Sequence, residues 1–139
     1  MEGTYVVDAS VAAKWILKEP GQEDALEWLA RYLQGEIFLF APDLLLAEFA
    51  SLVVKRNRRK QLTAAQARDA YQMMRRFTPV LVETRPLLEQ ALELSLRYAL
   101  SLWDCVYLAA AMGRGCGLIT ADRRFYRGLA KVYPKAWLL

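Results

Sequence analysis

The chain has 139 residues, the length of one domain, and 55% of them are hydrophobic, so it can bury a sizeable core. It contains no histidine, which excludes histidine-assisted serine or cysteine hydrolysis, the usual zinc hydrolases and histidine-based RNA cleavage. Its formal net charge of +4 is compatible with a polyanionic partner but does not require one.

Short apolar runs alternate with longer helical patterns along the chain, and no repeat or linker divides it. This alternation is typical of a parallel sheet covered by helices on both sides, formed by residues 1–139 as a single domain. The apolar runs predict strands at 5–7, 37–40, 80–82 and 118–120, with 132–133 as a fifth candidate. The other patterns predict helices at 10–18, 22–34, 44–58, 64–77, 87–98, 102–112 and 123–130.

Residues that suit helix ends mark several of these boundaries. Side chains of Asp, Thr and Ser accept hydrogen bonds from the first N–H groups of a helix, and glycine adopts the left-handed conformation that ends one. The residues in question are Asp43, Thr63 and Ser101 before three helices, Pro86 in a first turn, and Gly113 and Gly115 after the apolar helix.

Cysteine usage and hydropathy indicate the compartment. Cys105 and Cys116 are too few for a disulfide framework and form no C-x-x-C pair, so we expect reduced thiols in the core. The first residues show no signal-peptide pattern, and the longest apolar run, 98–112, is too short to cross a bilayer and contains Asp104. We therefore expect a soluble cytoplasmic protein with no membrane segment.

Acidic residues follow two of the predicted strands. Asp8 comes directly after the first strand, and Asp122 comes two residues after the fourth. Both therefore fall at the carboxyl edge, where parallel sheets bind ligands. Each has a structural alternative, because Asp8 or Ser10 would also suit the start of the first helix, and Thr120 or Asp122 that of the last.

Two further acids lie in apolar helices. Glu48 is the one charged residue from 44 to 54 and lies in mid-helix rather than at a cap, which favours a functional role. Asp104 follows Ser101 by three residues, as in a capping box, but a cap explains poorly an acid flanked by apolar residues. Burial of a carboxylate is costly unless the group is paired or bound to a metal.

Four acids in apolar surroundings would repel one another unless a divalent cation compensated their charge. Carboxylate ligands without imidazole match the preference of Mg²⁺ or Mn²⁺, and such an ion activates a water for attack on a phosphodiester. Ser10 and Thr120 would hold metal-bound waters or orient the carboxylates, with helix capping as their alternative role. The predicted metal ligands are Asp8, Glu48, Asp104 and Asp122.

Positive charge gathers in two short stretches that are candidates for binding RNA phosphates. Residues 55–60 contain five Lys or Arg residues. The alternative for this run is a solvated helix end, where cations complement the helix dipole. The second group consists of Arg123, Arg124, Arg127 and Lys131.

At these residues the sequence resembles a PIN domain, and in particular the VapC toxins of toxin–antitoxin pairs. The resemblance covers nearly the whole chain and rests on 6–11 (VVDASV), on 42–55 around Glu48, on 100–104 (LSLWD), and on the T-x-D-x-x-F pattern within 118–125. It implies a three-layer α/β/α sandwich with a central parallel sheet of four or five strands, and Mg²⁺- or Mn²⁺-dependent endonuclease cleavage of RNA. By position, it assigns metal binding to Asp8, Glu48, Asp104 and Asp122, with Ser10 and Thr120 assisting.

The resemblance also implies a homodimer and a VapB-like antitoxin that inserts a segment into the site. The amphipathic pattern at 22–34 suits such contacts, although core packing explains it too. Two departures from the family pattern stand out. Ser51 replaces an asparagine often found one turn after the helix-borne acid, and Phe125 and Tyr126 stand where some relatives have a further acid that bears on a second metal.

Two other functions compete with the nuclease. A phosphatase of the haloacid dehalogenase type needs a second acid two residues after Asp8, where this chain has Ser10. A non-catalytic RNA-binding module on the same fold would use the basic stretches alone. Such a module gains nothing from four negative charges at the edge where phosphates would bind, so the acids favour the nuclease.

Overall fold

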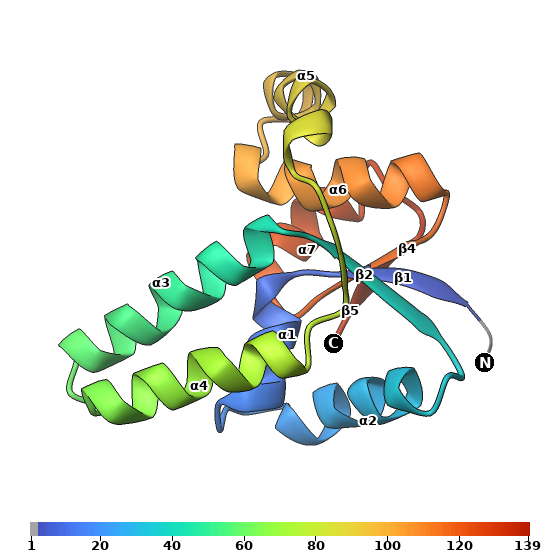
Figure 1. The fold of residues 1–139 in the computed structure, drawn as a ribbon. Helices are drawn as coiled ribbons and strands as arrows, with labels where there is room; N and C mark the ends of the chain where they lie inside the picture. Colours follow the sequence, from blue (N-terminus) through green and yellow to red (C-terminus); the bar gives the residue numbers. More distant parts are fainter. Residues whose placement is uncertain (1–2) are drawn as a thin grey trace.

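The computed structural model describes residues 3–139, which fold around a five-stranded sheet (Figure 1). All neighbouring strands are parallel, which confirms the predicted sheet. The chain builds outward from β1 to β3 and then returns to place β4 on the other side of β1, so the strand order reverses there. Parallel sheets bind ligands beyond their carboxyl ends at such a reversal. In spatial order the strands are β3 (Val80–Val82), β2 (Phe38–Pro42), β1 (Thr4–Val7), β4 (Gly117–Thr120) and β5 (Ala136–Leu138).

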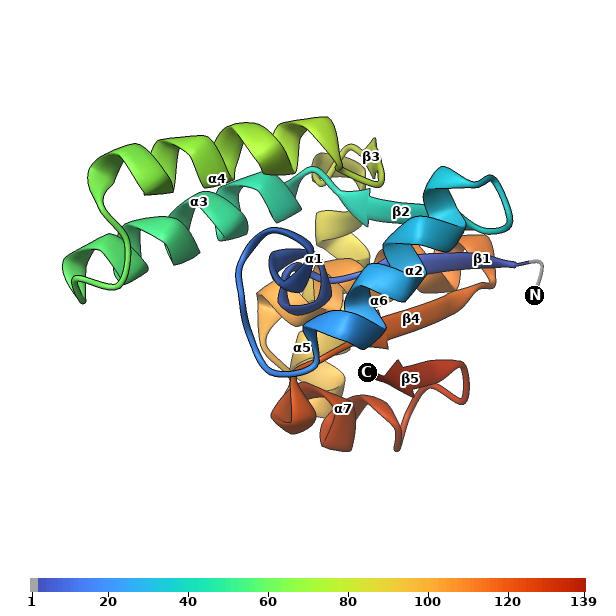
Figure 2. The ribbon, with the colours of Figure 1, turned by 90° about the horizontal axis from the view of Figure 1, so that it is seen from below.

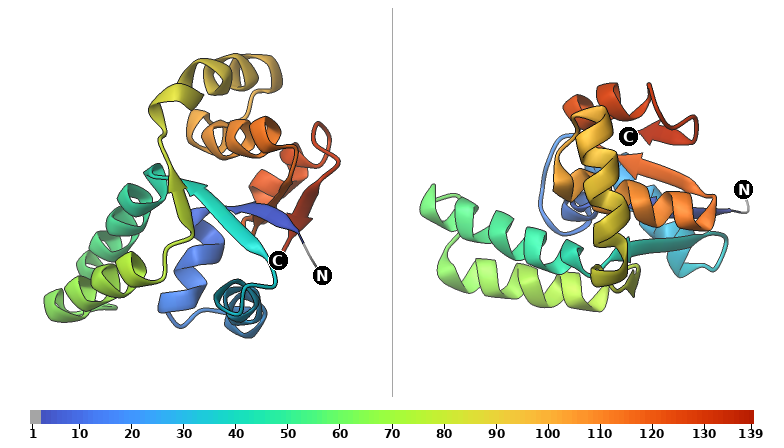
Figure 3. Two further views of the ribbon diagram at one scale, coloured as in Figure 1. Left: turned by 45° about the vertical axis from the view of Figure 1, so that its right-hand side comes forward. Right: turned by 90° about the horizontal axis from the view of Figure 1, so that it is seen from above.

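Helices cover both faces of the sheet and give the three layers that the resemblance implies (Figures 1 and 3). One face carries α1 and α2, the other carries α5 and α6, and α7 contacts β5 at the edge. The helices are α1 (Ala9–Ile16), α2 (Gln22–Leu33), α3 (Leu44–Arg58), α4 (Ala64–Arg76), α5 (Leu88–Tyr98), α6 (Leu102–Arg114) and α7 (Arg123–Leu129), with the short 3-10 helix η1 (Arg85–Leu87) before α5.

The centre of the sheet is apolar because helices bury it on both sides. Val6 and Leu118, on neighbouring strands, are fully buried, and so are all residues from 105 to 111 in α6. Cys105 and Cys116 are both free and buried, as predicted. Among residues 3–139, even so apolar a helix as α6 falls short of the length and hydropathy needed to span a membrane.

Helices α3 and α4 pair side by side and project beyond the sheet as an arm (Figure 2). Thr63 starts α4 as predicted, with a complete capping box: its hydroxyl accepts from the Gln66 N–H at 3.1 Å, and the Gln66 side chain accepts from the Thr63 N–H at 2.8 Å. The predicted cap of α3 by Asp43 is wrong. The Asp43 carboxylate accepts instead from the Thr84 hydroxyl at 2.6 Å and the Thr84 N–H at 3.1 Å, which ties the start of α3 to the end of β3.

Three other predicted boundaries differ from the structure. Gly115, with φ of 60°, ends α6 in the left-handed conformation, whereas Gly113 lies inside the helix. Pro86 belongs to η1 rather than to the first turn of α5. The fifth strand at 132–133 is wrong, because the N–H groups of Val132 and Tyr133 both donate to the Leu129 carbonyl and so finish α7; β5 follows at Ala136–Leu138.

Candidate active site

Asp8 and Asp122 occupy equivalent places, each between a central strand and the helix that follows it. Asp8 Oδ1 accepts from the N–H groups of Ser10 at 3.0 Å and Val11 at 3.3 Å, at the start of α1. Asp122 Oδ1 accepts from the N–H groups of Arg124 at 2.9 Å and Phe125 at 3.2 Å, at the start of α7. Both acids are therefore helix caps, and both also bring a carboxylate to the carboxyl edge of the sheet.

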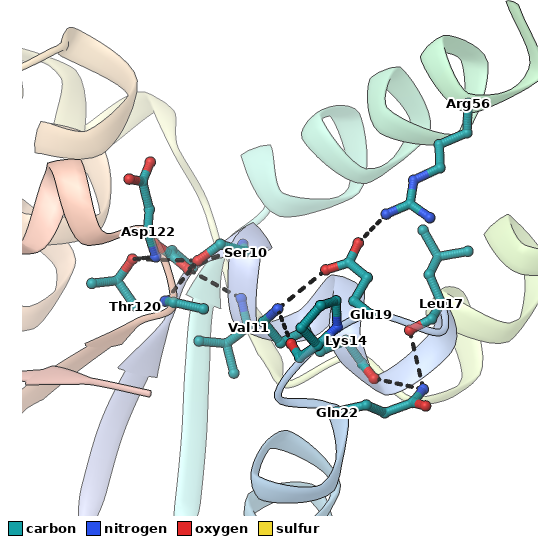
Figure 4. Close-up of polar contacts among 12 residues, drawn as sticks. Ser10, Val11, Lys14, Leu17, Glu19, Gln22, Arg56, Thr120 and Asp122 are labelled. Atoms are coloured by element: carbon teal, nitrogen blue, oxygen red, sulfur yellow. Dashed lines mark hydrogen bonds and ion pairs between the residues drawn. The ribbon is translucent and has the colours of Figure 1, made fainter. Parts of the chain in front are cut away.

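Two hydroxyl groups join these strand ends, as Figure 4 shows from the labelled Ser10, Thr120 and Asp122. Ser10 Oγ donates to Asp8 Oδ1 at 2.5 Å, accepts from the Ala121 N–H at 2.9 Å and lies 3.3 Å from Thr120 Oγ1. Thr120, which is fully buried, accepts from the Asp122 N–H at 3.0 Å. The pair thus fixes the end of β1 against the end of β4, and neither hydroxyl caps a helix.

Glu48 comes from α3, and a tyrosine that sequence reasoning missed holds it. The Tyr107 hydroxyl donates to Glu48 Oε1 at 2.6 Å, from a side chain in α6 that is only 1% exposed. Among the described residues Glu48 forms no ion pair with Lys55, a possible partner about two turns further along α3 but not at ideal spacing. The sequence feature that could have identified Tyr107 is its position three residues after Asp104, which places both side chains on the same face of α6.

Electrostatic repulsion links the four acids through Asp104, which lies in the first turn of α6. Burial, together with the negative charges of Asp122 and Glu48, raises the pKa of Asp104 to about 6. Burial raises the pKa of Asp8 to about 6 as well, with a smaller contribution from Asp104. Burial also raises the pKa of Glu48, and the hydrogen bond from Tyr107 offsets part of that increase. Asp104 thus interacts with each of the other three acids.

The donor chemistry of this cluster fits a hydrated hard cation. Within residues 3–139, no three Cys, Asp or Glu side chains stand close enough together to enclose a metal ion. Mg²⁺ does not need such a cage, because it keeps several waters and uses one or two carboxylates. Burial is the main cause of the raised pKa values of Asp8 and Asp104, and repulsion from neighbouring acids adds to it; a divalent cation would favour the ionised forms of both carboxyls.

A groove of about 540 Å³ opens beside the acids. Its lining includes Ser10, Glu48 and Ser51. Trp103, next to Asp104 in the chain, also lines the groove and is 56% exposed. Glu48, the one acid of the four that lines the groove, is therefore accessible to a ligand much larger than a water molecule.

Comparison with curated proteins gives relatives that match most of the chain. A VapC ribonuclease of Mycobacterium bovis and the ribonuclease VapC9 of Mycobacterium tuberculosis are each 36% identical over 119 residues, which cover 86% of this chain and 86% of each relative.

Solved structures share the fold. PAE2754 from Pyrobaculum aerophilum superposes with a TM-score of 0.69 at 22% identity, over 96% of this chain and 89% of its own. VapC20 of Mycobacterium tuberculosis, described as a toxin that cleaves the sarcin–ricin loop, has a TM-score of 0.62 at 25% identity, over 87% and 92%. The structure of a toxin–antitoxin complex from Klebsiella pneumoniae contains a chain with a TM-score of 0.57 at 18% identity, over 95% and 94%.

The family model of the PIN domain matches residues 5–128, a span that contains all four acids, both hydroxyl residues and Tyr107. The parallel sheet and its flanking helices agree with this match, as do the curated relatives. The chain belongs to the PIN domain family and is similar to those of its members that are named VapC ribonucleases.

Proposed function

We propose that this protein is an endoribonuclease that hydrolyses RNA phosphodiesters with Mg²⁺ or Mn²⁺ bound at Asp8, Glu48, Asp104 and Asp122. The observation that carries the proposal is that Asp104 of α6 interacts electrostatically with three other acids: Asp8 after β1, Glu48 of α3 and Asp122 after β4, where the strand order reverses. The names of the VapC ribonucleases to which the chain is similar support the same activity.

The chain's own residues hold the site in shape before any ligand binds. The N–H groups at the start of α1 and the Ser10 hydroxyl fix Asp8, the N–H groups at the start of α7 fix Asp122, and the Tyr107 hydroxyl fixes Glu48. A bound divalent cation would supply a water of lowered pKa and would neutralise charge on the phosphate oxygens. Preorganised carboxylates avoid the cost of rearrangement at each turnover.

The role of a toxin with a VapB-like antitoxin is part of the proposal. Its support is the similarity to VapC proteins and the occurrence of this fold in a toxin–antitoxin complex from Klebsiella pneumoniae. A homodimer is expected as well. Three leucines spaced four residues apart on α5 are exposed and suit such a contact, which sedimentation of the purified protein would test; they are Leu88, Leu92 and Leu96.

The test is cleavage of a mixed-sequence single-stranded RNA by purified protein in Mg²⁺, in Mn²⁺ and in EDTA. We expect cleavage with either metal, none in EDTA, and none by Asp104→Asn. The matched control is Asp69→Asn, the same substitution at an exposed position of α4 outside the site. Equal cleavage by wild type and Asp104→Asn would overturn the proposal. RNA binding without cleavage or metal binding would favour the non-catalytic RNA-binding module.

A further inference from the structure

The groove beside the acids does not end at the site. A second hollow of about 530 Å³ lies next to it along α3, and Leu52 and Lys55 line both. The second hollow is also lined by Arg59, near the end of α3, and by Lys18, which follows α1. Together the two hollows form a continuous depression along the arm, which we call the α3 track. Residues 48 and 59 mark its length, about 16 Å at the rise of an α-helix.

The basic run 55–60 is not one patch, because the helix turns its side chains in different directions. Lys55 and Arg59, four residues apart, share the face that lines the track. Arg58 and Lys60, although also exposed, line neither hollow. The track therefore receives only part of the positive charge that the sequence concentrates here.

Among the cations of the track, one is already neutralised. Arg56 forms an ion pair with Glu19, which also pairs with Lys14 at 3.3 Å (Figure 4). Within residues 3–139, the ion pairs include neither Lys18 nor Lys55 nor Arg59, and all three are exposed. Three uncompensated positive charges thus lead away from the four acids.

We propose that the α3 track holds the single strand of RNA that flanks the cleaved bond, an inference that rests on the proposed function. Lys55, Arg59 and Lys18 contact successive phosphates, which a row of cations attracts regardless of sequence. The exposed indole of Trp103 offers a face on which a base beside the site stacks. Stacking on a side chain needs an unpaired base, so the track selects single strands over duplexes.

The test compares two double variants that each remove two positive charges from the same six-residue run. Lys55→Gln with Arg59→Gln alters the track, and Arg58→Gln with Lys60→Gln is the matched control. Binding of a labelled single-stranded RNA is measured over a range of salt in the Asp104→Asn background, so that binding is separate from cleavage. Cleavage is measured with Asp104 intact, and thermal melting confirms that each variant folds.

We expect the track variant to bind RNA about tenfold more weakly near physiological salt, and the control to stay within about twofold of the parent. The slope of log K against log salt should become shallower by about 1.4 in the track variant, since each phosphate contact of a single strand contributes about 0.7. Trp103→Leu should weaken binding of single strands about tenfold without changing that slope, because stacking releases no counterions.

Equal losses in the two double variants, or no loss in either, would overturn the track. Stronger dependence on Lys55 and Arg59 for binding a polyglutamate peptide than for binding RNA would assign the track to an acidic protein segment instead. The result separates this inference from the nuclease proposal. If wild type cleaves RNA but the two double variants bind RNA equally well, the track alone is refuted. If only the track variant loses binding but wild type does not cleave RNA, the nuclease proposal alone is refuted.

Discussion

Replacing Asp8 by asparagine should abolish cleavage and, at the same time, stabilise the fold. Asp8 is 5% exposed, and burial raises the pKa of its carboxyl from 3.8 to about 6. The folded state therefore binds the Asp8 proton more tightly than the unfolded chain does. The stability that the protonated carboxyl contributes is fully present below pH 3.8 and is lost as the pH rises through about 6. The difference between these pKa values corresponds to a free energy of unfolding of about 3 kcal/mol. Asparagine still caps α1 and carries no charge, so it avoids this loss.

The assay is urea denaturation of wild type and Asp8→Asn in EDTA at pH 4.5 and 7.5. From pH 4.5 to pH 7.5 the free energy of unfolding of wild type should fall by about 2 kcal/mol relative to that of the variant, because most of the titration of Asp8 in the folded state lies in this range. Asp69→Asn, at an exposed position of α4, reports the general effect of removing a charge. Added Mg²⁺ should stabilise wild type and not Asp8→Asn. A difference that does not change with pH, or that favours wild type at pH 7.5, would refute the argument that the buried charge of Asp8 opposes folding.

Three further substitutions test separate parts of the argument. Asp104→Asn should remove RNA cleavage in a gel assay while circular dichroism shows an intact fold; cleavage at the wild-type rate would exclude Asp104 from the mechanism. Tyr107→Phe should lower kcat about tenfold, the cost of about one hydrogen bond to a charged group. It should also move the acidic limb of the pH–rate profile to higher pH, because the lost hydrogen bond lowers the pKa of Glu48. An unchanged profile would contradict a positioning role for Tyr107. Gly117→Ala should lower the free energy of unfolding, measured by urea denaturation, by about 1–3 kcal/mol, since the added Cβ would lie 2.8 Å from the buried ring of Tyr5. A variant as stable as wild type would show that the ring moves aside freely.

The strands were predictable where they are short, apolar and buried on both faces. The run 118–120 predicts β4 to within one residue, because a central parallel strand has no polar side to interrupt it. The same reasoning fails at the sheet edge. Val132 and Tyr133 are apolar enough for a strand, but their N–H groups finish α7, and hydrophobicity carries no information about which carbonyl a backbone N–H reaches.

The acids of the site were predictable from their places, whereas the contacts that hold them were not. An acid within an apolar helix identifies Glu48 as a candidate site residue but does not show which residue contacts it. In the sequence, Tyr107 cannot be distinguished from any other core tyrosine. The basic run 55–60 shows the same limit. The sequence gives the charge of this run, but it does not show that Lys55 lines the track and Arg58 does not, because that depends on how α3 packs against the rest of the fold.

Capping and catalysis are not competing roles for Asp8 and Asp122, although each alone explains why an acid follows its strand. A helix start presents free N–H groups and a partial positive charge, which favour a carboxylate there. The hydrogen bonds to both caps use a single oxygen, Oδ1, at the carboxyl edge of the sheet. The second oxygen of Asp122 accepts none of the hydrogen bonds found among the described residues, which leaves it free for a cation. Because the fold needs a cap at the place where a parallel sheet binds its ligand, one residue type satisfies both demands, and a cap at a strand end is no argument against a site.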